Sequence, residues 1–388
     1  MYPLQSKERV AIVGAGFSGA VIAHSLCRSG YSCDVFETCR HVAGHCHSEH
    51  DSKTGILIHV FGPHIFHTDN IIVWNFVRQF DEFMPFANRV KAISKGSVYS
   101  FPINLLTINQ FFGKTFSPAE AKQFIDSLRE KSIIEPTTLE EQALRFVGRD
   151  LYEAFFKGYT MKQWGMDPSS LPASIMKRIP VRFNYEDKYY DSAFQGLPKH
   201  GYTYVIEKLL DHKNIKVHLG SLFRRASATD YAHVFYSGPI DTWFDHSEGR
   251  LAYRTLDFEC KYYTGDYQGN PVINYCDLNV PWTRVYEHKH FSPWESHTQT
   301  VIYKEYSRNC EAEDPPYYPI RLVGDRSQLA RYVERARAER NVTFVGRLGT
   351  YRYLDMDVTI AEALDVAVSF LRVTKGNDEM PAFVVDPL

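Results

Sequence analysis

The hydrophobic pattern at the start of the chain predicts a strand, a helix and a second strand in close succession. The run from Arg9 to Gly14 is short and apolar, which is typical of a buried strand. Apolar residues then recur at the spacing of one helix face, and a second apolar run from Ser32 to Phe36 ends beside Glu37. We therefore expect a β-α-β unit with a glycine-rich turn between its first strand and its helix.

After this unit the pattern changes several times. A polar loop at residues 39–55 precedes a helical pattern over residues 104–165, in which Ser117 and Glu120 have the spacing of a capping box. The later predicted elements are short buried strands at residues 216–220 and 233–241, alternating antiparallel strands over residues 250–306, and a strand, a loop and a helix that starts near Met356. We expect the nucleotide-binding part to be assembled from three separated segments.

Gly14, Gly16 and Gly19 form a G-x-G-x-x-G motif between the first predicted strand and the helix. Such glycines allow a tight turn, close approach of a pyrophosphate and close helix–strand packing, and the helix N-terminus attracts the pyrophosphate. Glu37, 18 residues after Gly19, is placed to accept hydrogen bonds from ribose hydroxyls, which disfavours NADP. The motif predicts a bound dinucleotide and leaves NAD and FAD as alternatives.

Composition excludes several classes of function. The 388 residues carry a net charge of −2, whereas a nucleic-acid-binding protein would present a strongly basic face. The chain has no apolar run of about 18 residues, the length that a membrane helix needs, and its polar N-terminus differs from a signal peptide. Seven cysteines without a C-x-x-C motif fit a reducing compartment. We expect a cytoplasmic protein without a nucleic-acid or membrane partner.

Six longer stretches, taken together, resemble a known family. They are GPHIFHT (residues 62–68), GRDLYEAFFKGYTMKQWG (148–165), KRIPVRFNYEDKYY (177–190), NVPWTRVYEHKHF (279–291), DPPYYP (314–319) and GRLGTYRYLDM (346–356). Their content and order resemble UDP-galactopyranose mutase, and the resemblance runs from about Arg9 to Phe370. Members of that family are FAD flavoenzymes that interconvert the six-membered and five-membered ring forms of a UDP-sugar. The resemblance therefore implies FAD and a reaction without net redox change.

The resemblance also implies an α/β fold of three domains. A discontinuous Rossmann-like FAD-binding domain is expected at residues 1–85, 199–245 and 325–388. An inserted α-helical domain is expected at residues 102–182, with a mobile substrate loop at about 167–184. An antiparallel β-sheet domain is expected at residues 86–101, 183–198 and 246–324.

The mechanism implied by the resemblance is nucleophilic catalysis by the cofactor. Nitrogen N5 of reduced FAD attacks the anomeric carbon and UDP leaves. The covalent flavin–sugar adduct then lets the sugar reclose through a different hydroxyl before UDP returns. FAD is reduced beforehand by NAD(P)H or another external reductant. The implied substrates are UDP-galactopyranose and UDP-galactofuranose, with another nucleotide sugar such as UDP-N-acetylgalactosamine as an alternative. Bacterial members are often dimers, which implies a homodimer.

Side chains of three kinds are expected to bind the substrate. An aromatic row on the helical segment resembles the family's uracil-stacking platform, although such a row taken alone is more often part of a core; it comprises Phe155, Phe156, Tyr159, Thr160 and Trp164. Arg178, on the mobile loop, and Arg284 match the family's two diphosphate-binding arginines, whose planar donors suit phosphate oxygens. The other expected substrate positions are Asn88, Tyr189, Asn274, Tyr318, Tyr353 and Asp355.

The resemblance implies a second set of residues around the flavin. His67 matches the family's histidine beside the flavin and joins the two arginines as an expected catalytic residue, whereas His64 is more typical of a structural hydrogen-bonding residue. Arg347 and the main-chain N–H groups near Met356 suit the anion of reduced flavin. The expected cofactor-binding residues are Gly14, Gly16, Phe17, Ser18, Gly19, Glu37, Gly44, His45, His64, Arg347, Tyr353, Asp355 and Met356.

The loop after Glu37 departs from the family pattern. His45 and His47 stand where relatives typically have an asparagine and a tyrosine, and Leu354 stands where many have a second tyrosine. Cysteines and histidines crowd this loop at a spacing that a metal site can use; they are Cys39, His41, His45, Cys46, His47 and His50. Because the family wraps FAD with this loop, we expect no metal.

Three rival functions share part of this pattern. A flavin oxidoreductase of the amine-oxidase type would also bind FAD through both ends of the chain. A nucleotide-sugar-binding protein without catalysis would share the substrate residues. An NAD dehydrogenase fits least, because the regular strand–helix alternation stops after Glu37.

Overall fold

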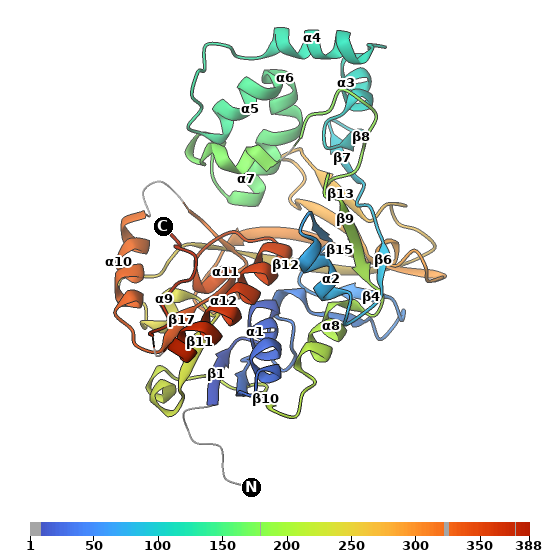
Figure 1. Cartoon of the computed structure of the whole chain (residues 1–388). Helices are drawn as coiled ribbons and strands as arrows, with labels where there is room; N and C mark the ends of the chain where they lie inside the picture. The colour runs from blue at the N-terminus through green and yellow to red at the C-terminus, as the bar shows by residue number, and fades with distance from the viewer. Residues whose placement is uncertain (1–8, 179, 322–325, 377) are drawn as a thin grey trace.

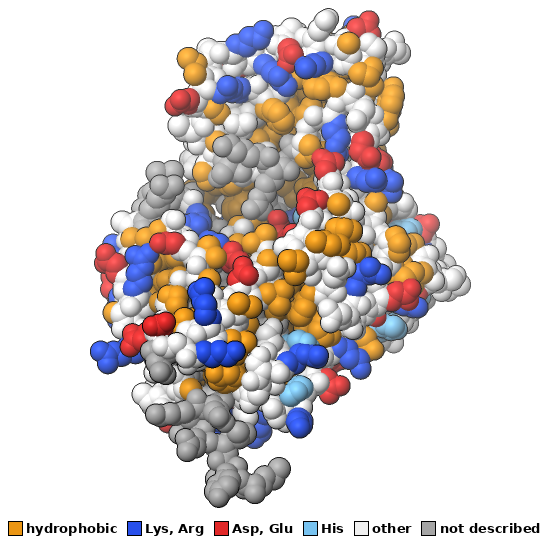
Figure 2. Space-filling model, in the orientation of Figure 1, with side chains coloured by type: hydrophobic (Ala, Val, Ile, Leu, Met, Phe, Trp, Pro, Cys, Tyr) orange, Lys and Arg blue, Asp and Glu red, His pale blue; other side chains and the backbone are white. Residues whose placement is uncertain are grey.

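The computed structural model describes residues 9–178, 180–321, 326–376 and 378–388. Two large sheets and a group of helices make up the molecule, and the helices of residues 105–164 stand at the end opposite the N-terminus (Figure 1). Figure 2 shows a hollow between this helical end and the rest of the protein, with hydrophobic side chains visible inside it. Across the described ranges, no helix combines the length and the apolar character that crossing a bilayer requires.

The β-α-β unit predicted at the start of the chain is confirmed, and it lies at the centre of a parallel sheet. The strand order is β10-β2-β1-β11-β17. The strands are β1 (Arg9–Val13), β2 (Ser32–Phe36), β10 (Ile215–His218), β11 (His233–Tyr236) and β17 (Val342–Phe344). All of these neighbours pair in parallel, so their carboxyl ends lie at one edge of the sheet.

Helices from both ends of the chain cover this sheet. Helix α1 (Phe17–Arg28) packs against α12 (Met356–Gly376) and against α8 (Gly201–Leu210) (Figure 1). The face of α1 predicted from the hydrophobic spacing is buried, with Val21 and Ile22 fully enclosed. Further helices surround the same sheet; they are η6 (Arg225–Asp230), α9 (Ile240–Trp243), α10 (Arg326–Arg337) and α11 (Gly346–Gly349).

The second large sheet has seven strands in the order β16-β12-β15-β14-β13-β7-β8. They are β7 (Val90–Ser94), β8 (Ser97–Phe101), β12 (Tyr253–Thr264), β13 (Val272–Tyr275), β14 (Arg284–Glu287), β15 (Gln299–Asn309) and β16 (Tyr318–Pro319). Every neighbouring pair is antiparallel except β13 with β7. In this register Asn274 lies opposite Arg284, and Arg284 lies opposite Glu305 on the next strand.

The helical end contains the pattern predicted over residues 104–165. Its elements are α3 (Leu105–Phe112), α4 (Pro118–Leu128), α5 (Leu139–Val147), α6 (Arg149–Leu151), a π-helical turn η3 (Tyr152–Lys157) and α7 (Gly158–Trp164). The capping box of Ser117 with Glu120 is confirmed at the start of α4. Gly165 caps the C-terminus of α7, and its φ of +66° is the left-handed conformation that glycine adopts most easily.

Smaller elements complete the chain. One pair of strands, β3 (Ser48–His50) with β4 (Leu57–His59), and one three-stranded sheet, β5-β9-β6, lie beside the parallel sheet. The other elements are η2 (Gly44–Cys46), β5 (Phe66–Thr68), α2 (Ile71–Val77), β6 (Phe83–Pro85), η4 (Pro168–Ser170), η5 (Ala173–Arg178), β9 (Phe194–Pro198) and η7 (His288–Phe291). Strand β9 falls in the stretch expected within the antiparallel domain, yet it pairs with β5 and β6. We keep the three-domain division as a proposal.

Candidate active site

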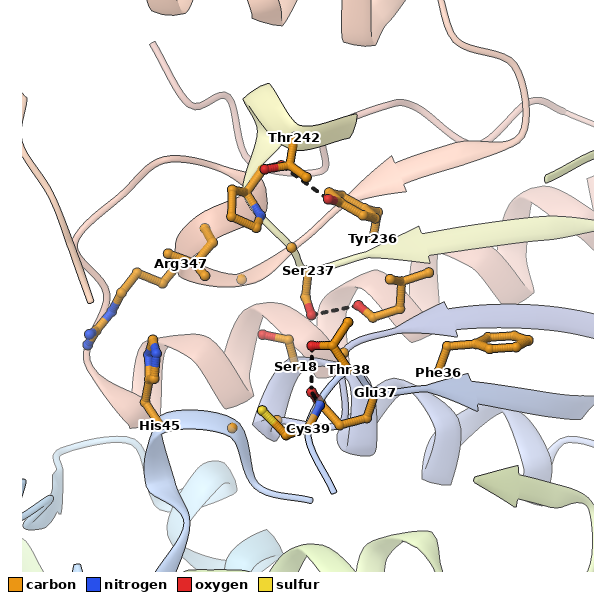
Figure 3. Close-up of a pocket in the computed structure, with 18 of the residues that line it drawn as sticks. Ser18, Phe36, Glu37, Thr38, Cys39, His45, Tyr236, Ser237, Thr242 and Arg347 are labelled. Atoms are coloured by element: carbon orange, nitrogen blue, oxygen red, sulfur yellow. Dashed lines mark hydrogen bonds between the residues drawn. The ribbon is translucent and has the colours of Figure 1, made fainter. Parts of the chain in front are cut away.

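A cavity of about 710 Å³ lies at the carboxyl edge of the parallel sheet, where the glycine-rich turn meets α11 and the start of α12. Figure 3 shows Glu37 and Cys39 near one end of this cavity and His45 and Arg347 at the other. A volume of this size is within the range of small-molecule and cofactor sites. The cavity is therefore large enough for a dinucleotide, and both N-terminal and C-terminal segments of the chain line it.

The three glycines of the motif occupy positions that other residues would disturb for different reasons. Gly14 has a φ of +103°, and a Cβ there would lie 2.1 Å from Ser237 Oγ. A Cβ at Gly19 would lie 2.0 Å from the carbonyl oxygen of Gly14, because α1 crosses β1 closely. A Cβ at Gly16, in contrast, would meet no described atom within 4 Å. Gly16 thus leaves room for a ligand, whereas Gly14 and Gly19 hold the turn itself.

The start of α1 faces the cavity. Its N-cap residue is Gly16, which has no side chain with which to satisfy the first N–H groups of the helix. Gly16, Phe17 and Ser18 all line the cavity. Free N–H groups and the positive end of the helix dipole together favour a phosphate at this point.

Glu37 is fixed at the end of β2 by three hydrogen bonds. Its Oε2 accepts from the main-chain N–H of Ala15 at 2.9 Å, and its Oε1 accepts from the N–H of Cys39 at 2.9 Å and from the Thr38 hydroxyl at 3.3 Å. An ionised carboxylate has about four acceptor sites, so it can accept a further hydrogen bond from a ribose hydroxyl. The placement of Glu37 on the cavity wall is consistent with this expected role.

The far end of the cavity holds a fixed positive charge. Arg347 donates to the carbonyl oxygen of Leu354 at 2.7 Å and to that of Tyr317 at 3.3 Å. Its guanidinium also lies over the rings of Tyr318 and Tyr353, 5.6 and 5.1 Å from their centroids. Since α12 begins at Met356 on the same wall, the two positive groups can stabilise one anion.

Two histidines beside Arg347 are held neutral. Burial, followed by the charges of Arg347 and His64, lowers the pKa of His45 to about 3. Burial and Arg347 likewise lower the pKa of His64 to about 4, while its Nδ1 lies 2.9 Å from the carbonyl oxygen of Gly62. The His45 ring stacks on Tyr317 with centroids 4.5 Å apart and planes 6° apart. His45 therefore adds an uncharged aromatic wall to the cavity.

A second cluster is built on the row Asn274, Arg284 and Glu305 across three adjacent strands. The Nε of Arg284 lies 3.0 Å from Oε1 of Glu305, which also accepts from the Thr283 hydroxyl at 2.8 Å. The Tyr286 hydroxyl donates to the other oxygen of Glu305. Burial is the largest single effect and acts against the charge of Arg284, but Glu305 together with Tyr159, Tyr286 and Tyr318 outweighs it and holds the pKa of Arg284 well above its usual value. Arg284 is thus a permanent cation.

Tyrosines surround Arg284 and remain protonated. Burial raises the pKa of Tyr159, Tyr189 and Tyr318 above the usual value, and the charge of Arg284 offsets only part of this effect. Tyr318 stacks on Tyr353 with ring centroids 5.5 Å apart. The cluster therefore combines one fixed cation with phenolic O–H donors, which is a suitable set for phosphate oxygens.

Two buried amide oxygens also lie among the expected substrate residues. Asn88 and Asn274 are both buried, and within the part of the chain that the structure describes neither Oδ1 atom has a hydrogen-bond partner. The main-chain carbonyl of Asn88 accepts from the N–H of Tyr189 at 2.8 Å, which places it beside the tyrosine cluster. Because buried polar atoms are normally satisfied, these two oxygens point to a polar ligand.

The aromatic row expected on one helix face is divided in the structure. Phe155 and Phe156 are only 2% and 3% exposed and pack into the core, where Phe155 meets Tyr99 edge-on at 5.1 Å. Tyr159 and Trp164 are half-buried. The π-helical turn over residues 152–157 breaks the 3.6-residue spacing on which a single face depends. The stacking role stays a prediction, and its accessible members are Tyr159 and Trp164.

The structure does not place the two other expected catalytic residues, His67 and Arg178, on the cavity wall. His67, on β5, stacks on Tyr190 with ring centroids 3.6 Å apart, and its Nδ1 is 3.2 Å from the Ser192 hydroxyl. It is not among the described residues that line the cavity. Arg178 ends the short helix η5, and its side chain falls outside the described part of the chain. Their catalytic roles stay predictions.

The histidine-rich loop is engaged in ring and hydrogen-bond contacts. His41 stacks on His47 at 3.8 Å, and Nδ1 of His47 lies 3.0 Å from the Thr203 hydroxyl. Burial raises the pKa of the Cys46 thiol to about 12, so it stays protonated. Gly44 turns the loop with a φ of +51°, and Gly44 to Cys46 line the cavity. These contacts fit a loop that wraps a cofactor.

Several residues at these sites were not identified from the sequence. Ser237, Tyr236 and Trp243 line the cavity because β11 and α9 end there, and no local motif marks them. Glu305 lies in an alternating strand, where only the strand register reveals its partner Arg284. Tyr317 had a signal, since it adjoins Tyr318 in the stretch DPPYYP.

The family model described as UDP-galactopyranose mutase matches residues 154–353, and one described as an NAD(P)-binding Rossmann-like domain matches residues 12–80. A solved structure of reduced UDP-galactopyranose mutase shares the fold, with a TM-score of 0.76, 13% identity and coverage of 97% of this chain and 98% of the other. A putative protoporphyrinogen oxidase from Exiguobacterium sp. 255-15 has a TM-score of 0.64 at 12% identity, covering 94% and 98% of the two chains.

Sequence relatives are considerably closer than these structures. A probable UDP-galactopyranose mutase of Klebsiella pneumoniae is 58% identical over 98% of this chain and 99% of its own length. A dTDP-fucopyranose mutase of Escherichia coli is 51% identical over 95% of this chain and 100% of its own length. These matches confirm the resemblance inferred from the sequence and make the chain an enzyme of the sugar mutase type. The protein belongs to the UDP-galactopyranose mutase family.

Proposed function

We propose that the protein interconverts UDP-galactopyranose and UDP-galactofuranose, with reduced FAD as cofactor and without net redox change. The observation that carries this proposal is the pairing of two sites: a dinucleotide cavity, and a neighbouring cluster of Arg284, tyrosine hydroxyls and unpaired amide oxygens. A dehydrogenase of the simple NAD type requires only the first. A diphosphate-binding cluster beside a flavin site suits a nucleotide sugar.

The residues of the cavity fit FAD. Gly16 and the N-terminus of α1 would hold the pyrophosphate, and Glu37 would accept from the ribose. Arg347, neutral His45 and the start of α12 would surround the isoalloxazine. When bound and reduced, the flavin supplies an electron-rich nitrogen nucleophile for the anomeric carbon. The reductant that generates this form is an external NAD(P)H or another donor.

The protein's own contribution is to bind the leaving diphosphate and to stabilise charge. Arg284 keeps its charge at every physiological pH because Glu305 lies beside it, and it can therefore hold the departing phosphate oxygens. Tyr159, Tyr189 and Tyr318 stay protonated and can donate to the same oxygens. Arg178 lies in the segment that the sequence predicts to be a mobile substrate loop, and closure of such a loop would add a second guanidinium and exclude water. Trp164 and Tyr159 would stack on the base.

The decisive experiment uses the purified holoenzyme with UDP-galactofuranose. We expect no conversion with oxidised FAD and conversion to UDP-galactopyranose after dithionite reduction, without consumption of reductant. Turnover by the oxidised enzyme, or one reductant consumed for each product, would instead indicate an oxidoreductase. Binding of UDP without any ring conversion would indicate a non-catalytic nucleotide-sugar-binding protein.

A second candidate is the same reaction on a deoxythymidine diphosphate sugar. The 51% identity to the dTDP-fucopyranose mutase extends over 95% of this chain, so identity alone does not separate the two substrates strongly. The furanose forms of dTDP-fucose and UDP-N-acetylgalactosamine should therefore be tested beside UDP-galactofuranose. We expect the highest kcat/KM with UDP-galactofuranose.

A further inference from the structure

The side chain of Lys162 makes an unusual set of contacts. Its Nζ lies within hydrogen-bond distance of four main-chain carbonyl oxygens, 2.7 Å from Tyr275, 3.0 Å from Asp277, 3.0 Å from Val280 and 2.9 Å from Trp282. An ammonium group has three N–H donors and no acceptor, so these carbonyls share three hydrogens and one charge. Burial lowers the pKa of Lys162 to about 8, which leaves the ammonium as the main form at neutral pH.

All four carbonyls belong to the connection between β13 and β14, which runs from Tyr275, the last residue of β13, to Thr283. Asn274 and Arg284 form the last paired positions of the two strands before this loop. The loop therefore sets where the Arg284 side chain leaves the sheet. At the base of the loop, the main-chain N–H of Tyr275 donates to the carbonyl oxygen of Thr283 at 2.9 Å.

Lys162 itself lies on α7, the helix that carries Tyr159 and Trp164. One turn earlier on the same face, a Cβ at Gly158 would lie 2.3 Å from the carbonyl oxygen of Cys276, so the helix and the loop are in direct contact there as well. Tyr159 is close enough to Arg284 for the two to shift each other's pKa. Helix α7 and the loop thus form adjoining walls of the proposed substrate site.

The C-terminal end of α7 is held separately. Arg254 on β12 donates to the carbonyl oxygen of Gln163 at 3.0 Å and to that of Lys162 at 3.4 Å. Ser307 on β15 donates to the same Gln163 carbonyl at 2.7 Å. These bonds fix the main chain of α7 at Lys162 to the sheet. The ammonium group therefore extends from a rigid backbone position towards the loop.

We infer that Lys162 is a positioning residue for the diphosphate: its ammonium gathers the four carbonyls of the β13–β14 loop and thereby holds Arg284 and Asn274 in register with α7. This inference rests on the proposed function, because it concerns the same substrate site. The ammonium donates hydrogen bonds to the four carbonyl oxygens and offsets the repulsion between their dipoles. A neutral apolar side chain of similar length would leave these carbonyl dipoles facing one another without a donor.

Lys162→Met tests the inference, because methionine keeps the apolar stem and removes the donors. In the FAD-bound enzyme we expect the Kd for UDP, measured by titration calorimetry at pH 7, to rise at least about tenfold, since small displacements of a binding group are costly. The FAD-to-protein ratio and the visible flavin spectrum should stay as in the wild type. Hydrogen exchange of the amides of residues 276–283 should become faster.

A double-mutant cycle separates positioning from a general loss of stability. If Lys162 acts through Arg284, adding Lys162→Met to Arg284→Ala should weaken UDP binding by no more than about twofold beyond Arg284→Ala alone. Lys157→Met, five residues earlier in the chain, is the matched control and should bind UDP within about twofold of the wild type. Additive effects in the cycle would overturn the inference.

Two outcomes remain to be distinguished. If Lys162→Met does not fold, Lys162→Arg serves in its place, because its planar guanidinium keeps the charge but cannot aim at four carbonyls from one point; a Kd within about threefold of the wild type would then refute the inference. Failure of both variants to fold would assign Lys162 to stability alone. If the wild type binds no UDP, the proposed function fails, and exchange in residues 276–283 still decides whether Lys162 holds the loop.

Discussion

The Nε atom of Arg284 lies 3.0 Å from Oε1 of Glu305, a carboxylate whose side chain is 1% exposed. The two residues lie opposite each other on the paired strands β14 and β15, and the Thr283 and Tyr286 hydroxyls donate to the same carboxylate. Because the contact uses Nε, the terminal nitrogens of the guanidinium fork can donate to a phosphate. Glu305 thus fixes the orientation and the charge of Arg284 together.

Replacing Arg284 by alanine should remove most of the activity. Loss of a charge-assisted phosphate contact costs about 2–5 kcal/mol, which corresponds to about thirtyfold to several-thousandfold in kcat/KM. Arg308→Ala is the control, since Arg308 on the same sheet pairs with Asp257 and Asp314 at the surface. A decrease of less than about fivefold in kcat/KM for Arg284→Ala would reject the assignment.

Replacing Glu305 by glutamine should destabilise the protein. The substitution keeps the shape but leaves the Arg284 charge without its buried partner, and breaking such a pair costs about 3–5 kcal/mol. The free energy of unfolding in urea measures this effect. Glu259→Gln, which removes a surface carboxylate from the same sheet, should change it by less than about 1 kcal/mol. Equal losses for the two variants would contradict the prediction.

Alanine at Gly14 should affect stability, whereas alanine at Gly16 should affect FAD binding. Gly14→Ala places a methyl group 2.1 Å from Ser237 Oγ at a φ of +103° and should lower the stability of the apoprotein by about 1–3 kcal/mol. Gly16→Ala meets open space and should leave apoprotein stability nearly unchanged while reducing bound FAD. Thermal unfolding of the apoprotein and the absorbance of bound flavin measure the two effects. Full FAD content in Gly16→Ala would exclude the pyrophosphate from this point.

The stability of the protein at acid pH should depend on Glu287. Burial alone would raise the pKa of this carboxyl, but hydrogen bonds from His290 and from the main-chain N–H groups of Tyr267 and Gln268 outweigh burial and lower it from 4.5 to about 2. The ionised form therefore stabilises the fold above pH 4.5, and this contribution of about 3 kcal/mol is lost as the pH falls towards 2. Glu287→Gln should flatten the decline in the free energy of unfolding over that interval. An unchanged slope would contradict the assignment.

Alanine at Phe155 and alanine at Trp164 should distinguish a role in core packing from a role in stacking on the base. Phe155→Ala should cost about 3–5 kcal/mol of stability, because its ring is enclosed by the core. Trp164→Ala should cost less stability and weaken UDP binding by about 1–3 kcal/mol, the value of stacking on one base. Denaturation and UDP titration of each variant distinguish them. The reverse pattern would show that the base stacks on Phe155.

The parts of the fold that depend on local sequence were predictable. The strand from Ser32 to Phe36, the capping box of Ser117 with Glu120 and the helix from Met356 all follow from spacing and turn chemistry, and the structure has each of them. Glu37 was also placed on the cavity wall by the β-α-β unit. Strand-to-helix units of this kind carry their geometry in a few neighbouring residues.

The parts that depend on strand register or on distant packing were not predictable. Nothing near Arg284 in the chain indicates Glu305, because the two meet only when β14 pairs with β15. The pairing of β9 with β5 and β6 likewise joins segments over 100 residues apart. Phe155 and Phe156 lie within the π-helical turn and pack against Tyr99 and Phe101, which are more than 50 residues earlier in the chain.

The parallel sheet joins β1 near the beginning of the chain to β17 and α12 near its end. During synthesis on the ribosome, the glycine-rich turn emerges long before Arg347 and the start of α12, which line the same cavity. A nascent chain therefore cannot complete this cavity until Arg347 and the start of α12 have been made. Premature termination before Arg347 would leave a product that holds the phosphate end of the pocket and lacks the other.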